Sequence, residues 1–309
     1  MPSRTQWESS LDDLSRDTRS GAQEIATRAV HLLIDTIGDS DPAGAISYRQ
    51  WLLRISRQLI AVQPSMGILF RLVNDMLWAA DGATGAVEMR QAALDYLQQF
   101  QARESMALLT LIEAASAHLA QYRAVMTYSR SSTVVRALSE LGNRKLQVFC
   151  GEGRPMYEGQ TLASELGWAG VRVVLGIDMA LFNWLSEVQA LVIGADSLGR
   201  TGLVNKIGSA ELVRAAAEAD IPRIVLATTS KFMPNDFLAG QHIHRGDPEE
   251  IMPVSSSNVE VRNITFDVTP LELITMVISE KGPLQGEHLL EELDAVRTYP
   301  GLRRISSAS

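Results

Sequence analysis

The sequence predicts an α/β protein, in which an N-terminal helical domain (residues 1–121) is followed by a Rossmann-like domain with a parallel sheet (residues 122–309). Two patterns predict this class. Before residue 121, apolar residues recur at helical spacing, as in the stripe that runs from Ile25 to Ile34. After residue 122, short apolar runs alternate with amphipathic segments, an order typical of parallel strands joined by right-handed crossover helices.

The helical half contains a second amphipathic pattern near its end. This stripe is formed by Leu108, Leu109, Ile112, Ala115 and Leu119. The Trp and Met residues between positions 51 and 80 fit the packed faces of helices, so we expect them in the hydrophobic core.

Five short apolar runs are predicted as the strands of the second half. They are "RAVMTY" (123–128), "LQVFC" (146–150), "VRVVL" (171–175), "ALVIG" (190–194) and "RIVLAT" (223–228). In an open α/β sheet, ligands bind beyond the carboxyl ends of the strands. The polar residues at this rim are Ser129, Arg130, Ser131, Glu152, Arg154, Asp178, Asp196, Asn205, Lys206 and Lys231. Such a set suits a small, polar, phosphorylated ligand, and because no G-x-G-x-x-G follows the first strand we expect no cofactor.

Composition narrows the class of protein. The net charge of −8 argues against a broad nucleic-acid-binding surface. The polar N-terminus and the absence of a long apolar run predict a cytoplasmic protein with no membrane segment. Cys150 is the single cysteine of the sequence, which excludes an intramolecular disulfide, and we expect it to be a buried small hydrophobe. The "HIH" at 242–244 is expected in an exposed loop or strand edge, and we expect no metal site.

Four separated motifs at and beyond the predicted rim resemble one family. They are "GADSLGRTGLVNKIG", "GEGRPMYEGQTLASEL", "TTSKF" and "VRNITFDVTPLELITMVISEKG". They are similar to signatures shared by the regulatory subunits of translation initiation factor 2B and by two sugar-phosphate isomerases, which convert methylthioribose-1-phosphate and ribose-1,5-bisphosphate from aldose to ketose. The resemblance is strong over residues 123–283 and weaker at 20–26 and 63–69. It implies a helical domain on a Rossmann-like domain, and dimers formed through the latter.

The resemblance also implies roles for individual residues. Asp196 matches the catalytic acid of the isomerases, and Ser129 stands at the position of their catalytic Cys. The resemblance, taken together with the polar residues that follow the strands, gives a predicted ligand-binding set. Its members are Ser20, Gln63, Ser129, Arg130, Arg154, Asn205, Lys206 and Lys231.

The departures from the isomerase pattern decide the predicted function. The first turn reads Tyr128-Ser129-Arg130 where the isomerases have a His-Cys-Asn sequence, and Ser20 and Gln63 stand where two phosphate-holding arginines belong. A serine hydroxyl can transfer protons near neutral pH only beside a strong base, and the turn itself contains none. We therefore predict a protein like the regulatory subunits, which binds a sugar phosphate or nucleotide, meets an unidentified protein partner, and lacks typical isomerase activity.

An enzymatic alternative stays open. In it, the protein is an aldose–ketose isomerase with a rebuilt site, where Asp196 works with Tyr128 or Glu152. In a purely structural role, Asp196 would cap the turn after its strand.

Other site residues also have structural interpretations. Asn205 and Lys206 are expected to begin a helix, with or without binding an anion there. Arg154 could form an ion pair with Glu152 or Asp178.

Residues 263–282 are the predicted dimerisation segment. It has an apolar, strand-like start, a helix expected to begin near Pro270, and an apolar stripe formed by Leu271, Ile274, Val277 and Ile278. We expect a homodimer formed through the Rossmann-like half.

Overall fold

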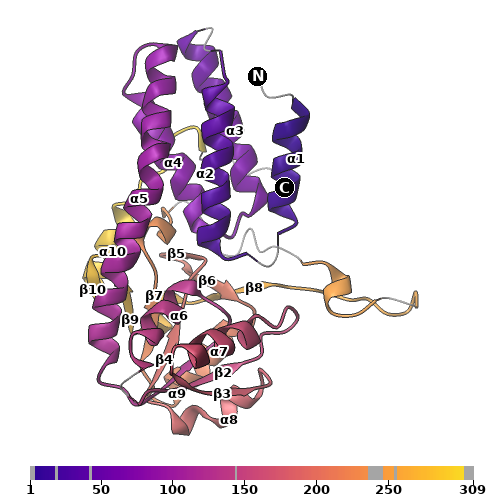
Figure 1. Ribbon diagram of the computed structural model, residues 1–309, viewed down its shortest axis with the longest axis vertical. Coiled ribbons are helices and arrows are strands. Elements are labelled where there is room, and N and C mark those ends of the chain that lie inside the picture. Colours follow the sequence, from indigo (N-terminus) through magenta and orange to yellow (C-terminus); the bar gives the residue numbers. More distant parts are fainter. Residues whose placement is uncertain are drawn as a thin grey trace.

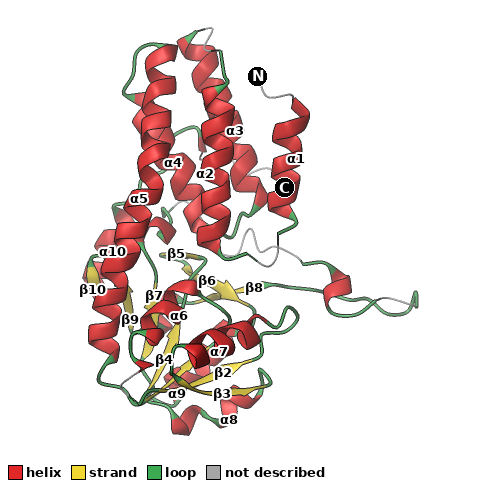
Figure 2. Cartoon of the chain, viewed as in Figure 1, coloured by secondary structure: helices red, strands yellow, loops and turns green. Residues whose placement is uncertain are grey.

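The computed structural model describes residues 4–17, 20–41, 44–142, 145–235, 246–253 and 256–302. A bundle of long helices stands on a layered α/β body, as the fold class predicts (Figure 1, Figure 2). The helices are α1 (Arg4–Ser15), α2 (Ala22–Gly38), α3 (Ala45–Val62), α4 (Gly67–Asp81), α5 (Ala86–Leu119), α6 (Ser132–Ser139), α7 (Glu158–Trp168), α8 (Ala180–Asn183), α9 (Ser209–Glu218) and α10 (Gly286–Asp294). The strands are β1 (Ala124–Thr127), β2 (Gln147–Gly151), β3 (Arg172–Gly176), β4 (Ala190–Ile193), β5 (Ser197–Gly199), β6 (Gly202–Lys206), β7 (Arg223–Leu226), β8 (Phe266–Thr269), β9 (Met276–Ser279) and β10 (Gly282–Leu284).

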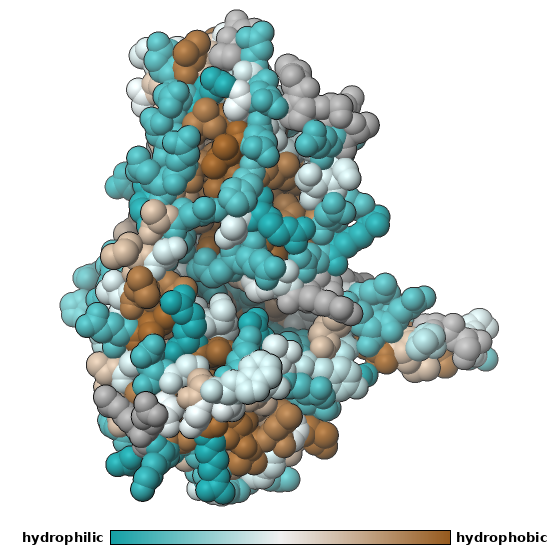
Figure 3. Space-filling model, viewed as in Figure 1, coloured by the Kyte–Doolittle hydropathy of each residue, from teal (hydrophilic) through white to brown (hydrophobic). Residues whose placement is uncertain are grey.

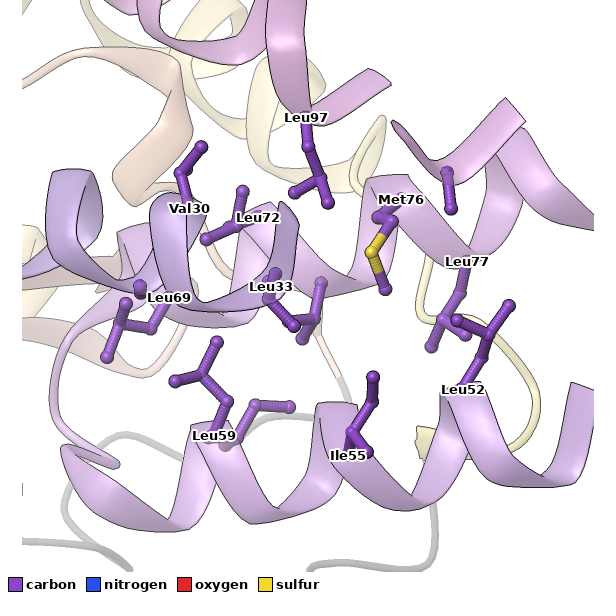
Figure 4. Packing of buried hydrophobic residues seen from close by; sticks show 14 of the residues in the cluster. Val30, Leu33, Leu52, Ile55, Leu59, Leu69, Leu72, Met76, Leu77 and Leu97 are labelled. Carbon is purple, nitrogen blue, oxygen red and sulfur yellow. The ribbon is translucent and has the colours of Figure 1, made fainter. Parts of the chain in front are cut away.

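The apolar stripes of α2 to α5 meet in one core. Leu33, Leu59 and Leu72 come from three different helices and are fully buried there (Figure 4). Leu97 of α5 points into the same cluster. The helical spacing of apolar residues is thus explained by burial against neighbouring helices.

Helix α5 joins the bundle to the sheet. Its first half, including Leu97, packs in the bundle, whereas Leu111 and Leu119 pack in the core beside the sheet (Figure 1). The chain returns to the bundle near its end, where Tyr299 and Leu302 are buried in the helical core. The division into domains at residue 121 therefore stays a prediction, because one continuous helix serves both cores.

The larger sheet has the strand order β10-β9-β7-β4-β1-β2-β3. Its strands pair in parallel except for β10, which pairs antiparallel with β9. Helices α5, α6 and α7 cover one face, while α8, α9 and α10 cover the other. Both faces are buried, and for this reason the strands read as nearly continuous apolar runs. The five strands predicted from the sequence are β1, β2, β3, β4 and β7.

A smaller antiparallel sheet, in the order β5-β6-β8, was not predicted. Asn205 and Lys206 are the last residues of β6, opposite Asp267 and Phe266 of β8. The prediction that they begin a helix is wrong, because the helix starts at Ser209. The prediction of a helix near Pro270 is also wrong: a single 3₁₀ turn, η5 (Leu271–Leu273), leads into strand β9.

Exposed apolar side chains gather beside strand β3. They are Trp168, Leu175, Ile177 and Met179. Figure 3 shows apolar surface in the lower part of the molecule, where Figure 1 places β3 and α8. Because β3 and β10 are opposite edges of the sheet, this surface is separate from the predicted dimerisation segment. None of the described helices has the length and apolar character needed to cross a membrane.

Candidate functional site

A cavity of about 420 Å³ lies where the carboxyl ends of the parallel strands meet the helical bundle. Eight of the nine predicted site residues line it. They are Ser20, Gln63, Ser129, Arg130, Asp196, Asn205, Lys206 and Lys231. The turns after β1, β2, β4 and β7 all contribute lining residues, and this is the geometry that the topology of an open α/β sheet favours for a ligand site.

Asp196 follows strand β4 and is held by its backbone. Its N–H donates to the carbonyl of Val204 on β6, and its own carbonyl accepts a 2.9 Å hydrogen bond from the N–H of Gly67 at the start of α4. Burial raises the pKa of its carboxyl group to about 6, while the positive charges of Lys231 and Lys206 oppose the rise. A carboxyl group that titrates near neutral pH can act as an acid or a base in catalysis.

Lys206 and Lys231 are both more than nine-tenths buried. The Lys231 ammonium donates a 2.6 Å hydrogen bond to the carbonyl of Ala195, next to Asp196. Burial lowers the pKa of Lys231, against the attraction of Asp196 and Glu104. Lys206 instead forms a 2.7 Å salt bridge with Glu158. The two lysines thus bring positive charge to the cavity from two different elements.

Glu158, the first residue of α7, is the residue that the sequence reasoning missed. The Ser129 hydroxyl donates a 2.9 Å hydrogen bond to Oε1 of Glu158, the same oxygen that contacts Lys206. The sequence contains one signal for it, since Glu158 lies within the "GEGRPMYEGQTLASEL" motif that follows a rim strand. Ser129 itself has a φ of 60°, a left-handed backbone conformation uncommon for a residue with a side chain.

Two buried polar atoms at the cavity have no hydrogen-bond partner among the described residues. They are the amide nitrogen Nδ2 of Asn205 and the second carboxylate oxygen, Oε2, of Glu158. Leaving such groups unpaired costs roughly 1–3 kcal/mol each, so native proteins rarely do so without a ligand or water to satisfy them. One atom donates and the other accepts, which suits the hydroxyl groups of a sugar.

Two helix N-termini also open into the cavity. Ser20 and Ala22 bring the start of α2 to it, and Ser131 and Ser132 bring the start of α6. Free N–H groups at a helix start attract anions. Arg130 lies beside α6, and its guanidinium donates two hydrogen bonds of 2.7 and 3.0 Å to the carboxylate of Glu165.

The side chain of Gln63 is hydrogen-bonded to the protein backbone. Its side-chain amide donates to the carbonyls of Leu14, Ser15 and Asp17 at 3.2–3.5 Å, which ties the end of α1 and the residues that follow it to the end of α3. The Ser20 N–H donates to the carboxylate of Asp17. Both residues line the cavity, but these contacts hold the backbone around it.

Arg154 is exposed and does not line the cavity. Its guanidinium donates to the hydroxyl of Tyr157 at 2.6 Å and lies over the same ring. The predicted ion pair with Glu152 or Asp178 is also absent among the described contacts; the Asp178 carboxylate accepts from the backbone N–H groups of Gly153 and Arg154.

The residues considered as alternative acid/base partners of Asp196 do not lie at the cavity. Neither Tyr128 nor Glu152 lines the cavity. Tyr128 is buried and donates to the carbonyl of Ile207, and burial raises the pKa of its hydroxyl. Cys150 is 1% exposed within the core, as predicted, and burial raises its thiol pKa to about 12. The described residues contain no cluster of three His, Cys, Asp or Glu that could hold a metal ion, and the "HIH" at 242–244 lies outside them.

Known proteins share this architecture. The Initiation factor 2 subunit family matches residues 18–286. A ribose 1,5-bisphosphate isomerase from Archaeoglobus fulgidus is 30% identical over 275 residues, which span 86% of this chain and 86% of that protein. The crystal structure of the translation initiation factor eIF-2B from Pyrococcus horikoshii OT3 has a TM-score of 0.77 and 25% identity, covering 94% of this chain and 100% of that one. The 5-methylthioribose 1-phosphate isomerase from the same organism shares the fold, with a TM-score of 0.68 and 21% identity over 93% of this chain and 86% of that one. The motifs, the fold and the relatives agree, and the chain belongs to the Initiation factor 2 subunit family.

Proposed function

We propose that the protein is an aldose–ketose isomerase of phosphorylated sugars, whose active site is rebuilt relative to the cysteine-dependent isomerases that its motifs resemble. The observation that carries the proposal is the cavity in which Asp196, with a pKa of about 6, adjoins the buried Lys206 and Lys231. Isomerisation moves hydrogen between neighbouring carbons and needs an acid or base that changes protonation near the working pH. Asp196 meets that requirement.

The ligand is proposed from the polar groups around Asp196. The lysines and the N-termini of α2 and α6 favour an anion such as a phosphate. The unpaired Asn205 amide favours a hydroxyl or carbonyl oxygen beside it. Ribose 1,5-bisphosphate is the first substrate to test, because a relative with 30% identity carries that activity in its name.

This proposal reverses the preference drawn from the sequence. Ser129 has no base in its own turn, but in the folded protein the Glu158 carboxylate is its hydrogen-bond partner. Binding without catalysis remains the second candidate, because Ser20 and Gln63 replace two arginines of the isomerase pattern and eIF-2B of Pyrococcus horikoshii shares the fold. In either role we propose a cytoplasmic homodimer.

The test is direct conversion. The purified protein is incubated with ribose 1,5-bisphosphate and, separately, with methylthioribose-1-phosphate, and the ketose product is followed by ¹³C and ³¹P NMR. We expect the wild type to form ketose and Asp196→Asn to form none, with Asp220→Asn, an exposed aspartate on another surface, as the active control. Binding of either compound by calorimetry without any ketose would reject the isomerase and favour the binding protein.

A further inference from the structure

We infer that Ser129 and Glu158 act as one proton-accepting pair, in which the Ser129 hydroxyl takes a proton from a substrate hydroxyl and passes its own to the Glu158 carboxylate. The inference rests on the isomerase activity proposed above, and it names the second proton-transfer group of that site.

The hydrogen-bond geometry supports the pair. The Ser129 hydroxyl is already 2.9 Å from Oε1 of Glu158, so its proton points toward the carboxylate and its lone pairs are left to accept a proton from elsewhere. Both residues line the cavity. The left-handed φ of Ser129 is a local strain of the kind that active sites maintain.

Two features of the structure position the Glu158 carboxylate beside Ser129. Lys206 lies 2.7 Å from Oε1, and the carboxylate is at the start of α7, where the helix dipole stabilises negative charge. Its other oxygen, Oε2, is buried and has no hydrogen-bond partner among the described residues.

Glu158 and Asp196 can divide the two roles of acid and base between them. Burial raises the pKa of Asp196, and the negative charge of Glu158 raises it further. A carboxyl group whose pKa is raised keeps its proton to a higher pH and can donate it. Asp196 is then the proton donor, and the Ser129–Glu158 pair is the acceptor.

The chemistry balances with these two groups. In a ring-closed aldose 1-phosphate, the bond between C1 and the ring oxygen breaks, and the ring oxygen takes a proton from Asp196. The hydrogen on C2 moves to C1 with its electron pair, so that C2 is oxidised and C1 is reduced. The O2 hydroxyl loses its proton through Ser129 to Glu158 as C2 becomes a carbonyl. One proton is given and one is accepted, with no external oxidant or reductant.

The test compares Glu158→Gln, Ser129→Ala and the double variant, with the exposed Glu187→Gln as a matched control. Each single variant should lower kcat about 100- to 10,000-fold with little change in KM, as for the loss of one proton-transfer group. The double variant should be no slower than the worse single one, because both changes break the same relay. Glu158→Asp, which keeps the carboxylate, should recover part of the activity. Glu158→Gln should also move the basic limb of the pH profile of kcat/KM to lower pH, because Asp196 acts in its protonated form and its pKa falls when the negative charge of Glu158 is removed.

The outcomes separate the two proposals. If the wild type converts no sugar phosphate, the proposed isomerase activity and the proposed proton-accepting pair are both rejected. If the wild type is active and Glu158→Gln keeps its kcat, or if the two single effects multiply in the double variant, the pair is rejected and the isomerase stands. A purely structural role would instead raise KM or lower the unfolding temperature without moving the pH profile.

Discussion

Replacing Asp196 with asparagine should stabilise the folded protein while it removes isomerase activity. The carboxyl pKa is raised from the ordinary value of 3.8 to about 6, chiefly by burial. The folded state therefore resists ionisation of this group more than the unfolded state does. Each unit of difference between the two pKa values corresponds to about 1.36 kcal/mol. Ionised Asp196 therefore lowers the free energy of unfolding by on the order of 3 kcal/mol.

The sign of the pH dependence follows from the raised pKa. Below about pH 4 the group is largely protonated in both states, so the wild type and Asp196→Asn should differ little in this contribution. As the pH rises through 6, the wild type loses the stability that the neutral carboxyl provides, and the amide of the variant does not ionise. The advantage of the variant should therefore grow between pH 4 and 7 and level off above it.

Urea denaturation between pH 4 and 8 measures this difference as a free energy of unfolding. Asp220→Asn, at an exposed position, should show no comparable growth with pH. A difference between wild type and Asp196→Asn that is constant across the range, or that favours the wild type above pH 7, would refute the raised pKa of Asp196 and with it the acid role. A variant that is more stable yet inactive would fit a carboxyl group retained for catalysis.

Four further outcomes are expected. Lys206→Ala should weaken binding of a phosphorylated sugar by roughly tenfold or more in calorimetry, without unfolding the protein, because a charge-assisted contact is lost. Gly67→Ala should destabilise the protein by about 1–3 kcal/mol in urea denaturation, since its Cβ would lie 2.8 Å from the carbonyl of Lys231, whereas Gly82→Ala, with open space around it, should not. Cys150 should react with a thiol reagent only after unfolding, because it is buried and its pKa is raised to about 12. Light scattering at micromolar concentration should report a homodimer, and a monomer at all concentrations would contradict the predicted interface.

The fold class and eight of the residues that line the cavity could be predicted from the sequence alone. Helical spacing in the first half and short apolar runs in the second are local patterns, and the rule that ligands bind at the carboxyl ends of parallel strands converts them into a position in space. Asp196, Lys206 and Lys231 were identified in this way, and they do line one cavity. Their chemical roles are still predictions.

The contacts of those residues depend on how distant elements pack in the folded protein. Lys206 ends a strand rather than beginning a helix because β8, some sixty residues later, pairs with β6, and no local pattern encodes a partner so distant in the chain. Ser129 meets Glu158 across 29 residues, through a left-handed turn and the start of the next-but-one helix. The side-chain amide of Gln63 donates to backbone carbonyls at the end of α1. Local periodicity fixes which face of an element is buried, but hydrogen-bond partners depend on how separate elements pack, and so the base beside Ser129 could be found only in the folded protein.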